Sequence, residues 1–342
     1  MTMVRPRVLE ARPADLQLAA EVLQAGGLVA FPTETVYGLG AHARDAAAVA
    51  RLFRVKGRPA DNPVIVHLAG LDALGQVAAQ VTPLARSLAA QFWPGPLTLV
   101  LPARGDVPAV VTGAAPTVGV RVPDHPVALG LLAAADLPVA APSANRSGRP
   151  SPTTAAHVTA EFGADVEVVV DGGACRLGLE STVVDARGRV PVVLREGTVT
   201  REDLGLGLRG VPAGRSSAAP GAGTSTAASP GTRYRHYAPR CPVELVAPGQ
   251  GGIRAAIRAR AGEHVGLVAA APADAVEAVA VGGRVTVLAT FHDAVELGRR
   301  LYDALRRGEQ AGVDVIVVES VPEAGVGRAV MDRLRRAAGQ LG

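Results

Sequence analysis

One segment, residues 27–67, constrains the fold of this chain more than any other, because a short apolar run in it ends abruptly at a proline. Leu28 to Phe31 is typical of a buried strand, and Pro32 stops that strand. The polar run Thr33-Glu34-Thr35 is therefore expected at a strand end, where open α/β sheets bind their ligands.

The second half of this segment brings a helix, a loop and another strand to the same place. Residues 45–55 have a helical pattern with Asp45 as its N-cap. The helix delivers Lys56 and Arg58 on a loop that glycine and proline interrupt, and residues 63–68 resume a strand that ends near His67. We therefore expect hydroxyls, a lysine, an arginine, an amide and an imidazole beside strand ends.

Lys56 is the only lysine among 35 lysine and arginine residues, and the only two asparagines are Asn62 and Asn145. Arginine evidently replaces lysine wherever a generic positive charge suffices. The single lysine indicates a site that needs a compact ammonium rather than a planar guanidinium. The alternative is one surface lysine left by chance. The survival of a lysine and an asparagine in one loop favours the functional interpretation.

Strand-like and helix-like segments alternate along the chain as far as residue 195. Helices are predicted at residues 13–24, 83–92 and 127–135, and another begins near Thr153. Strands are predicted at residues 97–101, 117–122, 138–141, 166–170, 183–184 and 192–195. The loop at residues 141–152 is rich in small residues and hydroxyls, and it follows a strand and precedes a helix. Such a loop offers backbone N–H groups to an anion.

The length of 342 residues predicts two domains. We assign the first to residues 1–208 and the second to residues 240–342. A Gly/Pro/Ser/Ala-rich linker at 209–239 joins them, and near its end lies an aromatic and basic cluster, Arg233-Tyr-Arg-His-Tyr237. The linker is a candidate lid for the active site. In the second domain strands are predicted at residues 243–246, 265–269, 285–288 and 313–318, and helices at 253–261, 294–306 and 329–338. This alternation predicts a small parallel α/β domain, in which we find no cluster of catalytic residue types.

Composition and motifs exclude several classes of protein. The net charge of +4 permits an acidic ligand without requiring a protein that coats nucleic acid. Cys175 and Cys241 lack metal-site spacing and predict reduced thiols, and no signal peptide or membrane-spanning run is visible, so we expect a cytoplasmic protein. The glycines of residues 205–210 lack the flanking strand and helix of a dinucleotide-binding loop. Gly57 follows the only lysine, so there is no Walker A motif either.

The motifs that remain resemble the YrdC-like family. Lys56-x-Arg58 and Ser143-x-Asn145 are similar to the K-x-R…S-x-N signature of that family. The wider match takes in Pro32-Thr-Glu-Thr-Val-Tyr-Gly-Leu39, Gly57-Arg-Pro-Ala-Asp-Asn-Pro63, Trp93-Pro-Gly-Pro-Leu-Thr98, Leu179-Glu-Ser-Thr182 and Leu194-Arg-Glu-Gly197. This match covers roughly residues 10 to 205. The aromatic and basic cluster of the linker and the second domain together resemble the long, two-domain form of the family.

The resemblance implies a fold and a reaction. The expected fold is α/β, with a YrdC-like twisted mixed sheet flanked by helices, a concave ligand face, and a smaller Rossmann-like parallel domain. The expected reaction converts ATP, L-threonine and bicarbonate to threonylcarbamoyl-adenylate, pyrophosphate and water, with Mg²⁺ accompanying ATP and no metal site in the protein itself. This nucleotidyltransferase reaction is the first step of the t6A37 modification of tRNA. A tRNA threonylcarbamoyltransferase would take the product onward, and whether the protein binds tRNA directly stays open.

The resemblance also assigns roles to residues. Lys56 and Arg58 are the candidate catalytic residues. Threonine would be bound by Thr35, His67, Arg121 and Ser181, with Arg121 on its carboxylate. The ATP site would comprise Lys56, Arg58, Asn62, Thr117, Ser143, Asn145, Ser151, Arg195 and Tyr234. Structural alternatives remain open for several of these residues: His67 as a core histidine, Arg121 as a surface charge, Thr117 as an ordinary strand residue, and Tyr234 as packing for the linker.

Two other functions are compatible with the same sequence. A YrdC-like fold could bind double-stranded RNA or tRNA without catalysis, but aromatic residues are only 3% of the chain and no RNA-binding motif occurs. An accessory domain that hydrolyses carbamoyl phosphate would be expected to have zinc-finger cysteines beside it, and these are missing. The synthetic enzyme is the favoured interpretation.

Overall fold

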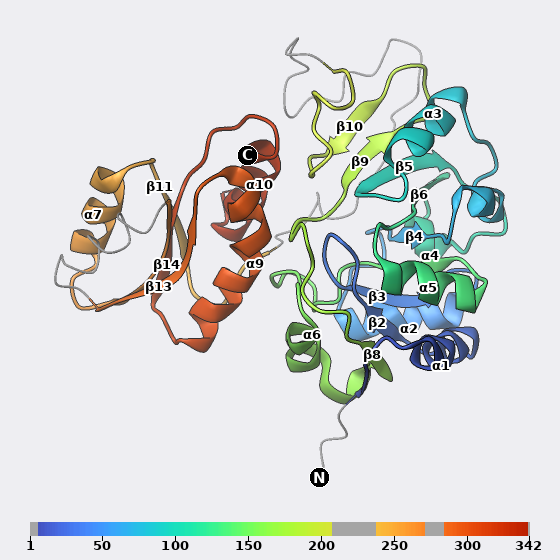
Figure 1. The fold of residues 1–342 in the computed structure, drawn as a ribbon, viewed down its shortest axis with the longest axis horizontal. Coiled ribbons are helices and arrows are strands. Elements are labelled where there is room, and N and C mark those ends of the chain that lie inside the picture. Colours follow the sequence, from blue (N-terminus) through green and yellow to red (C-terminus); the bar gives the residue numbers. More distant parts are fainter. Residues whose placement is uncertain (1–5, 207–236, 271–283, 341–342) are drawn as a thin grey trace.

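The computed structural model describes residues 6–206, 237–270 and 284–340, which form a large and a small sheet, each with its own helices (Figure 1). Most of the predicted linker, with Tyr234, lies outside the described residues. The large sheet belongs to the N-terminal part of the chain and the small sheet to the C-terminal part. Among the described residues, no helix combines the length and the apolar character needed to cross a bilayer.

The large sheet has ten strands in the order β1-β8-β2-β3-β7-β4-β6-β5-β9-β10. Their bounds are β1 Arg7–Leu9, β2 Val29–Phe31, β3 Gly38–His42, β4 Ile65–His67, β5 Leu97–Pro102, β6 Thr117–Arg121, β7 Val139–Ala140, β8 Val168–Val170, β9 Thr182–Asp185 and β10 Val192–Arg195. β4 runs parallel to β6, whereas β7 is antiparallel to both of its neighbours, β3 and β4. The sheet is therefore mixed, as the sequence predicts.

The helices of the N-terminal part are α1 Pro13–Gln24, α2 Ala46–Lys56, α3 Pro83–Phe92, α4 Ala109–Thr112, α5 Pro126–Ala135 and α6 Ala155–Phe162, with 3₁₀ turns at Leu71–Gln76 and Gly163–Asp165. Each begins within two residues of its predicted start except α4, which was not predicted. The Asp45 carboxylate accepts hydrogen bonds from the amides of Ala47 and Ala48 and so caps α2, as predicted. Gly57 ends α2 in the left-handed conformation (φ 60°), which a glycine adopts without strain.

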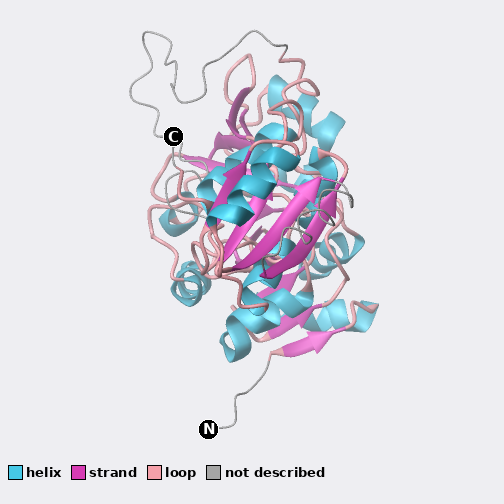
Figure 2. Ribbon diagram, turned by 90° about the vertical axis from the view of Figure 1, so that its left-hand side faces the viewer, coloured by secondary structure: helices cyan, strands magenta, loops and turns pink. Residues whose placement is uncertain are grey.

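The C-terminal part is an open sheet of four parallel strands in the order β11-β14-β12-β13. The strands are β11 Val243–Val246, β12 His264–Ala270, β13 Arg284–Phe291 and β14 Val315–Glu319. Helix α7 (Gln250–Ala259) covers one face, and α9 (Ala294–Gln310) and α10 (Gly327–Ala337) cover the face toward the large sheet (Figure 1). Figure 2 shows this part from the front, with strands and helices in separate layers. The predicted α/β class is confirmed for both parts.

Two strands of the large sheet were not predicted. β1 is short and lies at an edge of the sheet, and β3 is built from Gly38-Leu-Gly-Ala-His42, which has little intrinsic preference for a strand. β3 forms because it pairs with β2 on one side and with β7 on the other. Its glycines also suit the crowded position: a Cβ on Gly40 would lie 2.8 Å from Val139 Cγ1 and 2.9 Å from Phe31 Cε1.

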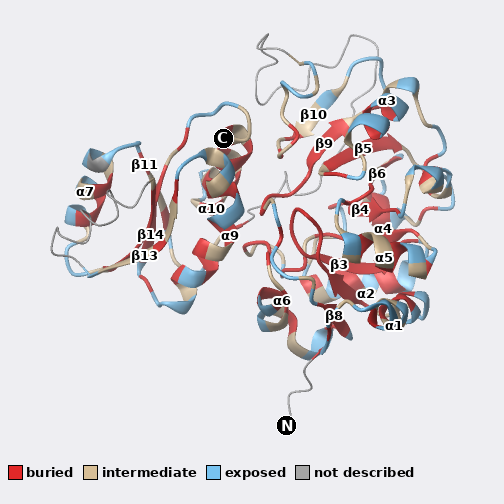
Figure 3. Ribbon diagram, in the orientation of Figure 1, coloured by how far each residue is buried: buried red, intermediate tan, exposed pale blue. Residues whose placement is uncertain are grey.

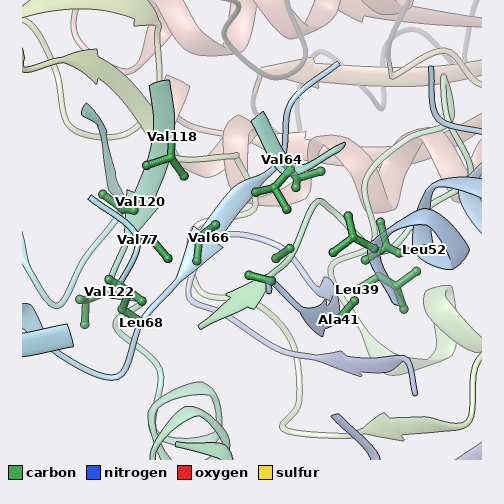
Figure 4. Close-up of a cluster of buried hydrophobic side chains, with 14 of the residues drawn as sticks. Leu39, Ala41, Leu52, Val64, Val66, Leu68, Val77, Val118, Val120 and Val122 are labelled. Carbon is green, nitrogen blue, oxygen red and sulfur yellow. The ribbon is translucent and has the colours of Figure 1, made fainter. Parts of the chain in front are cut away.

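The core lies between the large sheet and its helices, where buried residues follow the strands (Figure 3). On one side of the sheet Leu39 and Ala41 of β3 meet Leu52 of α2, and Val66 of β4 lies near Val120 of β6 (Figure 4). Because side chains alternate along a strand, the neighbours of Val66 point to the opposite face. Ile65 and His67 are therefore presented on that face, where the pocket described below lies.

Candidate active site

A pocket with about 720 Å³ of empty space, including its opening to solvent, lies on this face of the large sheet. Its floor includes β4 and β6, where Ile65 pairs with Gly119 and His67 with Arg121. The pocket thus extends along the strands and not only at their ends. Its walls come from the segment after β2, the end of α2, the loop after β7, and the loop before β9.

Lys56 closes one side of the pocket at the last residue of α2. Its Nζ donates to the carbonyl oxygen of Ser143 at 2.6 Å and also to that of Asn145, and the side chain is buried. Burial, with the neighbouring Arg58 charge, holds the pKa of the Lys56 ammonium well below its usual value. Lys56 therefore ties α2 to the loop after β7, and the oxygens that hold it are backbone carbonyls rather than carboxylates.

Arg58 is the second cation of this side. Its Nη2 donates to Asn62 Oδ1 at 2.9 Å and its Nε to the Asn62 carbonyl oxygen at 3.0 Å, while the guanidinium lies 5.6 Å from the ring centroid of Phe53. Burial lowers the pKa of Arg58 to about 10. Asn62 is therefore a partner of Arg58, and its Nδ2 is buried without a hydrogen-bond partner among the described residues.

The loop after β7 is held in shape by its own serine and asparagine. Ser143 Oγ donates to Asn145 Oδ1 at 2.6 Å, and Asn145 Nδ2 donates to the carbonyl oxygens of Arg146 and Arg149 at 2.8 and 3.0 Å. The spacing of Ser143 and Asn145 thus serves a local turn. The same turn presents the two carbonyl oxygens that bind Lys56.

Arg121 and His67 lie side by side on the floor of the pocket. Arg121 Nη2 is 2.6 Å from Glu34 Oε1, Nη1 donates to Thr35 Oγ1 at 2.9 Å, and Nε donates to the Gly95 carbonyl oxygen at 3.1 Å. Burial, together with the Arg121 charge, lowers the pKa of His67 to about 3, so its ring is neutral. Nδ1 of His67 has no hydrogen-bond partner among the described residues. Arg121 is buried, which rules out the surface-charge alternative.

Ser181 and Arg195 form another part of the pocket wall. Ser181 Oγ lies 2.8 Å from Thr98 Oγ1, and Arg195 donates from Nε and Nη2 to the Ser181 carbonyl oxygen at 3.1 and 2.9 Å. Burial lowers the pKa of Arg195, as it does for Lys56 and Arg58. The guanidinium therefore fixes the backbone of Ser181 while it lines the pocket.

A carboxylate that the sequence analysis did not single out, Glu180, also lines the pocket. Its partners are Ser151 Oγ at 2.6 Å, Tyr302 OH at 2.9 and 3.0 Å, and Arg333 Nε at 3.0 Å. Tyr302 lies on α9 and Arg333 on α10. The second domain, in which the sequence showed no cluster of catalytic residue types, therefore supplies two partners of a pocket-lining residue. No local pattern pointed to these partners, because they follow Glu180 by 122 and 153 residues.

The structure brings most of the predicted site residues into this one pocket. Those that line it are Thr35, Lys56, Arg58, His67, Arg121, Ser143, Asn145, Ser181 and Arg195. Asn62 and Ser151 lie behind this lining, as partners of Arg58 and Glu180 respectively, and Thr117 lies at the far end of β6 from Arg121, paired with Pro102. Tyr237, from the end of the predicted linker, also lines the pocket, and the sequence analysis gave it no role of its own.

Within the described residues, no group of three or more His, Cys, Asp or Glu side chains is arranged to hold a metal ion. The one carboxylate on the pocket lining, Glu180, is already engaged by three partners. The pocket otherwise offers four cationic side chains, which favours an anionic ligand.

Comparison with known proteins gives matches along nearly the whole chain. A family model described as "Telomere recombination" matches residues 21–197, and one described as "Threonylcarbamoyl-AMP synthase, C-terminal domain" matches residues 199–339. Threonylcarbamoyl-AMP synthase of Pyrococcus abyssi is 44% identical over 98% of this chain and 96% of its own length. The enzyme of the same name from Bacillus subtilis is 40% identical over 97% of this chain and 95% of its own.

Solved structures give the same result. The crystal structure of P. abyssi Sua5 complexed with L-threonine superposes with a TM-score of 0.84, at 41% identity, covering 99% of this chain and 98% of that one. Escherichia coli YciO matches with a TM-score of 0.50 and 25% identity, covering 57% of this chain and 96% of its own.

Proposed function

Because this chain belongs to the threonylcarbamoyl-AMP synthase family, we propose that it condenses ATP, L-threonine and bicarbonate to L-threonylcarbamoyl-AMP. Pyrophosphate and water are the other products, which makes the enzyme a nucleotidyltransferase. The product supplies the threonylcarbamoyl group of t6A37 in tRNA, and a tRNA threonylcarbamoyltransferase would receive it. A cytoplasmic location stays a prediction.

The main support for this proposal is that one pocket is lined by two groups of side chains, each suited to one substrate. Lys56, Arg58 and Arg195 supply positive charge for a polyphosphate. Arg121 and His67 supply a buried guanidinium and a neutral imidazole, which suit the carboxylate and the amine or hydroxyl of an amino acid. Both substrates would thus be held within reach of each other, as a reaction through a short-lived carbamate requires.

In the proposed reaction the threonine amine and bicarbonate form a carbamate and release water. A carbamate oxygen then attacks the α-phosphorus, and the bond to the pyrophosphate oxygen breaks. Arg121 would bind the threonine carboxylate with hydrogens that its contacts to Glu34 and Thr35 leave available, since a guanidinium has five. Holding the two reactants in line can supply roughly 7–11 kcal/mol of the barrier.

Charge on the phosphates would be balanced by buried cations, whose pKa values burial lowers. A polyphosphate next to Lys56 and Arg58 would raise these pKa values again, because an opposite charge favours the protonated form. ATP binding would therefore favour the positively charged forms of these side chains. We infer that Lys56 exchanges at least one of its carbonyl contacts for a phosphate oxygen when ATP binds.

We expect Mg²⁺ to enter this pocket together with ATP. The described residues contain no cluster of metal-binding side chains, and Mg²⁺ is commonly held through substrate phosphates with few protein ligands. When bound, it would neutralise part of the charge on the phosphates. The residues named above would bind and orient the substrates around it.

The test is an assay of the purified full chain with ATP, Mg²⁺, bicarbonate and threonine, following pyrophosphate and the adenylate product. We expect both products only when all the components are present. Serine should react severalfold more slowly, because it lacks a methyl contact worth about 1 kcal/mol or more. Formation of ADP and phosphate in place of pyrophosphate would rule out adenylation.

A further inference from the structure

Glu180 is the point at which the C-terminal part of the chain reaches the pocket. Its carboxylate accepts from Tyr302 OH at 2.9 and 3.0 Å and from Arg333 Nε at 3.0 Å. Arg333 is fully buried, and its Nη2 also donates to the Glu196 carbonyl oxygen at 2.9 Å, next to Arg195 of the pocket wall. Two side chains of the small domain thus hold a lining residue of the large one.

The residues just before Glu180 are held by the same helices. A Cβ on Gly178 would lie 2.6 Å from the backbone oxygen of Arg299, so this glycine packs directly on the backbone of α9. Leu179 is buried in a core cluster with residues of the C-terminal part, among them Leu297 and Val330. Residues 178–180 therefore all rest on α9 and α10, and Ser181, which lines the pocket, follows immediately.

Charge adds a second reason for this contact. Burial alone would raise the pKa of Glu180, but the charges of Arg333 and Arg195 and the Ser151 hydroxyl hold it below its usual value, so the group is a carboxylate. An anion on the lining of a pocket for a polyphosphate would repel that ligand unless it were neutralised. Arg333 supplies a charge for this purpose from outside the pocket lining.

We propose that Arg333 and Tyr302 are positioning residues of the active site, which neutralise Glu180 and hold it against Ser151 so that ATP can bind beside Ser181 and Arg195. They contact Glu180 and not the reacting atoms. The C-terminal domain is by this inference a structural component of the nucleotide site. The inference rests on the proposed function, because it takes the anionic ligand to be ATP.

The experiment uses the full chain in five forms: wild type, Tyr302→Phe, Arg333→Met, the double variant Arg333→Met/Glu180→Gln, and Arg328→Gln. Arg328 is the matched control, because it also lies on α10 and pairs across the two parts with Glu202, which does not line the pocket. Three properties are measured: the affinity for a non-hydrolysable ATP analogue, the KM values for ATP and threonine, and the hydrogen exchange of amides 178–182.

For Tyr302→Phe we expect roughly tenfold weaker binding of the analogue and a roughly tenfold higher KM for ATP, because one hydrogen bond to a charged group is lost. Arg333→Met should weaken binding of the analogue further than Tyr302→Phe does. The double variant should bind the analogue better than Arg333→Met alone, because it removes the bare carboxylate. Exchange of amides 178–182 should rise in Tyr302→Phe and stay unchanged in Arg328→Gln.

Outcomes separate this inference from the proposed function. If the wild type makes no adenylate, the proposed function fails, while the exchange measurement still tests the contact between the domains. If the wild type is active and Tyr302→Phe matches Arg328→Gln in affinity and exchange, the positioning role is overturned. If the double variant binds the analogue no better than Arg333→Met, the claim that Arg333 acts by neutralising Glu180 is refuted. Should Arg333→Met fail to fold, Tyr302→Phe decides.

Discussion

Lys56 ends α2 with its ammonium on two carbonyl oxygens of the loop after β7, whereas the family resemblance places it in the ATP site. The two interpretations agree, because a buried ammonium held only by neutral oxygens is available to an anion. The compact shape of the ammonium matters both when it contacts the carbonyl oxygens and when it contacts a phosphate. A guanidinium is larger and planar, and it presents its donors in a fixed fork.

We therefore expect Lys56→Arg to lower the rate of pyrophosphate release about a hundredfold, since the loss of one preorganised contact at such a site costs roughly 3 kcal/mol. The larger side chain should also lower the melting temperature, because overpacking a buried site costs about 1–3 kcal/mol. Arg54→Lys, an exposed change in the last turn of the same helix, is the control and should alter neither property. Full activity in Lys56→Arg would remove this residue from the catalytic set.

His67 predicts a dependence of stability on pH. Burial lowers its pKa to about 3 in the folded chain, whereas the unfolded chain takes up a proton near the ordinary value of about 6.5. Stability is therefore lost as the pH falls below about 6.5, by ~2 kcal/mol at pH 5. His67→Gln cannot titrate, so its melting temperature should fall less between pH 7.5 and 5 than that of the wild type.

The control for this measurement is His292→Gln, a change at an exposed histidine of the C-terminal part, which should keep the wild-type slope. Equal slopes for the wild type and His67→Gln would mean that the pKa of His67 is not lowered in the folded protein. In that case burial would not be what keeps the imidazole neutral.

At the scale of elements, helices were predicted better than short strands. The bounds of α1 and α3 match their predictions because a proline at the first turn, with periodic apolar residues, defines each helix locally. β3 has no such local definition. It is a strand because β2 and β7 lie on either side of it, and its small residues allow them to approach.

Gly40 of β3 tests this account. Gly40→Ala places a Cβ within 3 Å of both Val139 and Phe31, which should cost about 1–3 kcal/mol and lower the melting temperature by roughly 2–6 °C. Gly75→Ala is the matched control, because a Cβ there meets nothing within 4 Å, and it should change the melting temperature little. If both variants melt like the wild type, β3 has more room than its neighbours indicate.

For the whole molecule, the two sheets share a core and are not separate units. The apolar cluster of the C-terminal part includes Val36 and Leu179 from the N-terminal part, and Tyr237 stacks on Tyr302 with 5.4 Å between ring centroids. The ion pair of Glu180 with Arg333 crosses the same interface. Unfolding one part would leave buried charge and apolar surface of the other exposed.

We therefore expect a single cooperative transition in a calorimetric scan of the full chain. Glu180→Ala should split or broaden that transition, because it leaves the buried Arg333 guanidinium without its carboxylate partner. Glu202→Ala, which removes an exposed partner of Arg328, should leave one transition. Two well-separated transitions in the wild type would show that the parts unfold independently.

The sequence by itself determined the α/β class and most helices and strands, because strand ends and helix caps are local features. Nine of the residues that line the pocket were named through the resemblance of its motifs, among them Lys56-x-Arg58 and Ser143-x-Asn145, to a known family. Only the tertiary structure decided that Asn62 and Ser151 stand behind the pocket lining, that Glu180 belongs to it, and that Tyr302 and Arg333 hold Glu180 from another domain. The contacts of Tyr302 and Arg333 with Glu180 join residues more than a hundred positions apart, whereas those of Asn62 and Ser151 depend on how the loops around them fold. Neither relation leaves a periodic trace along the chain.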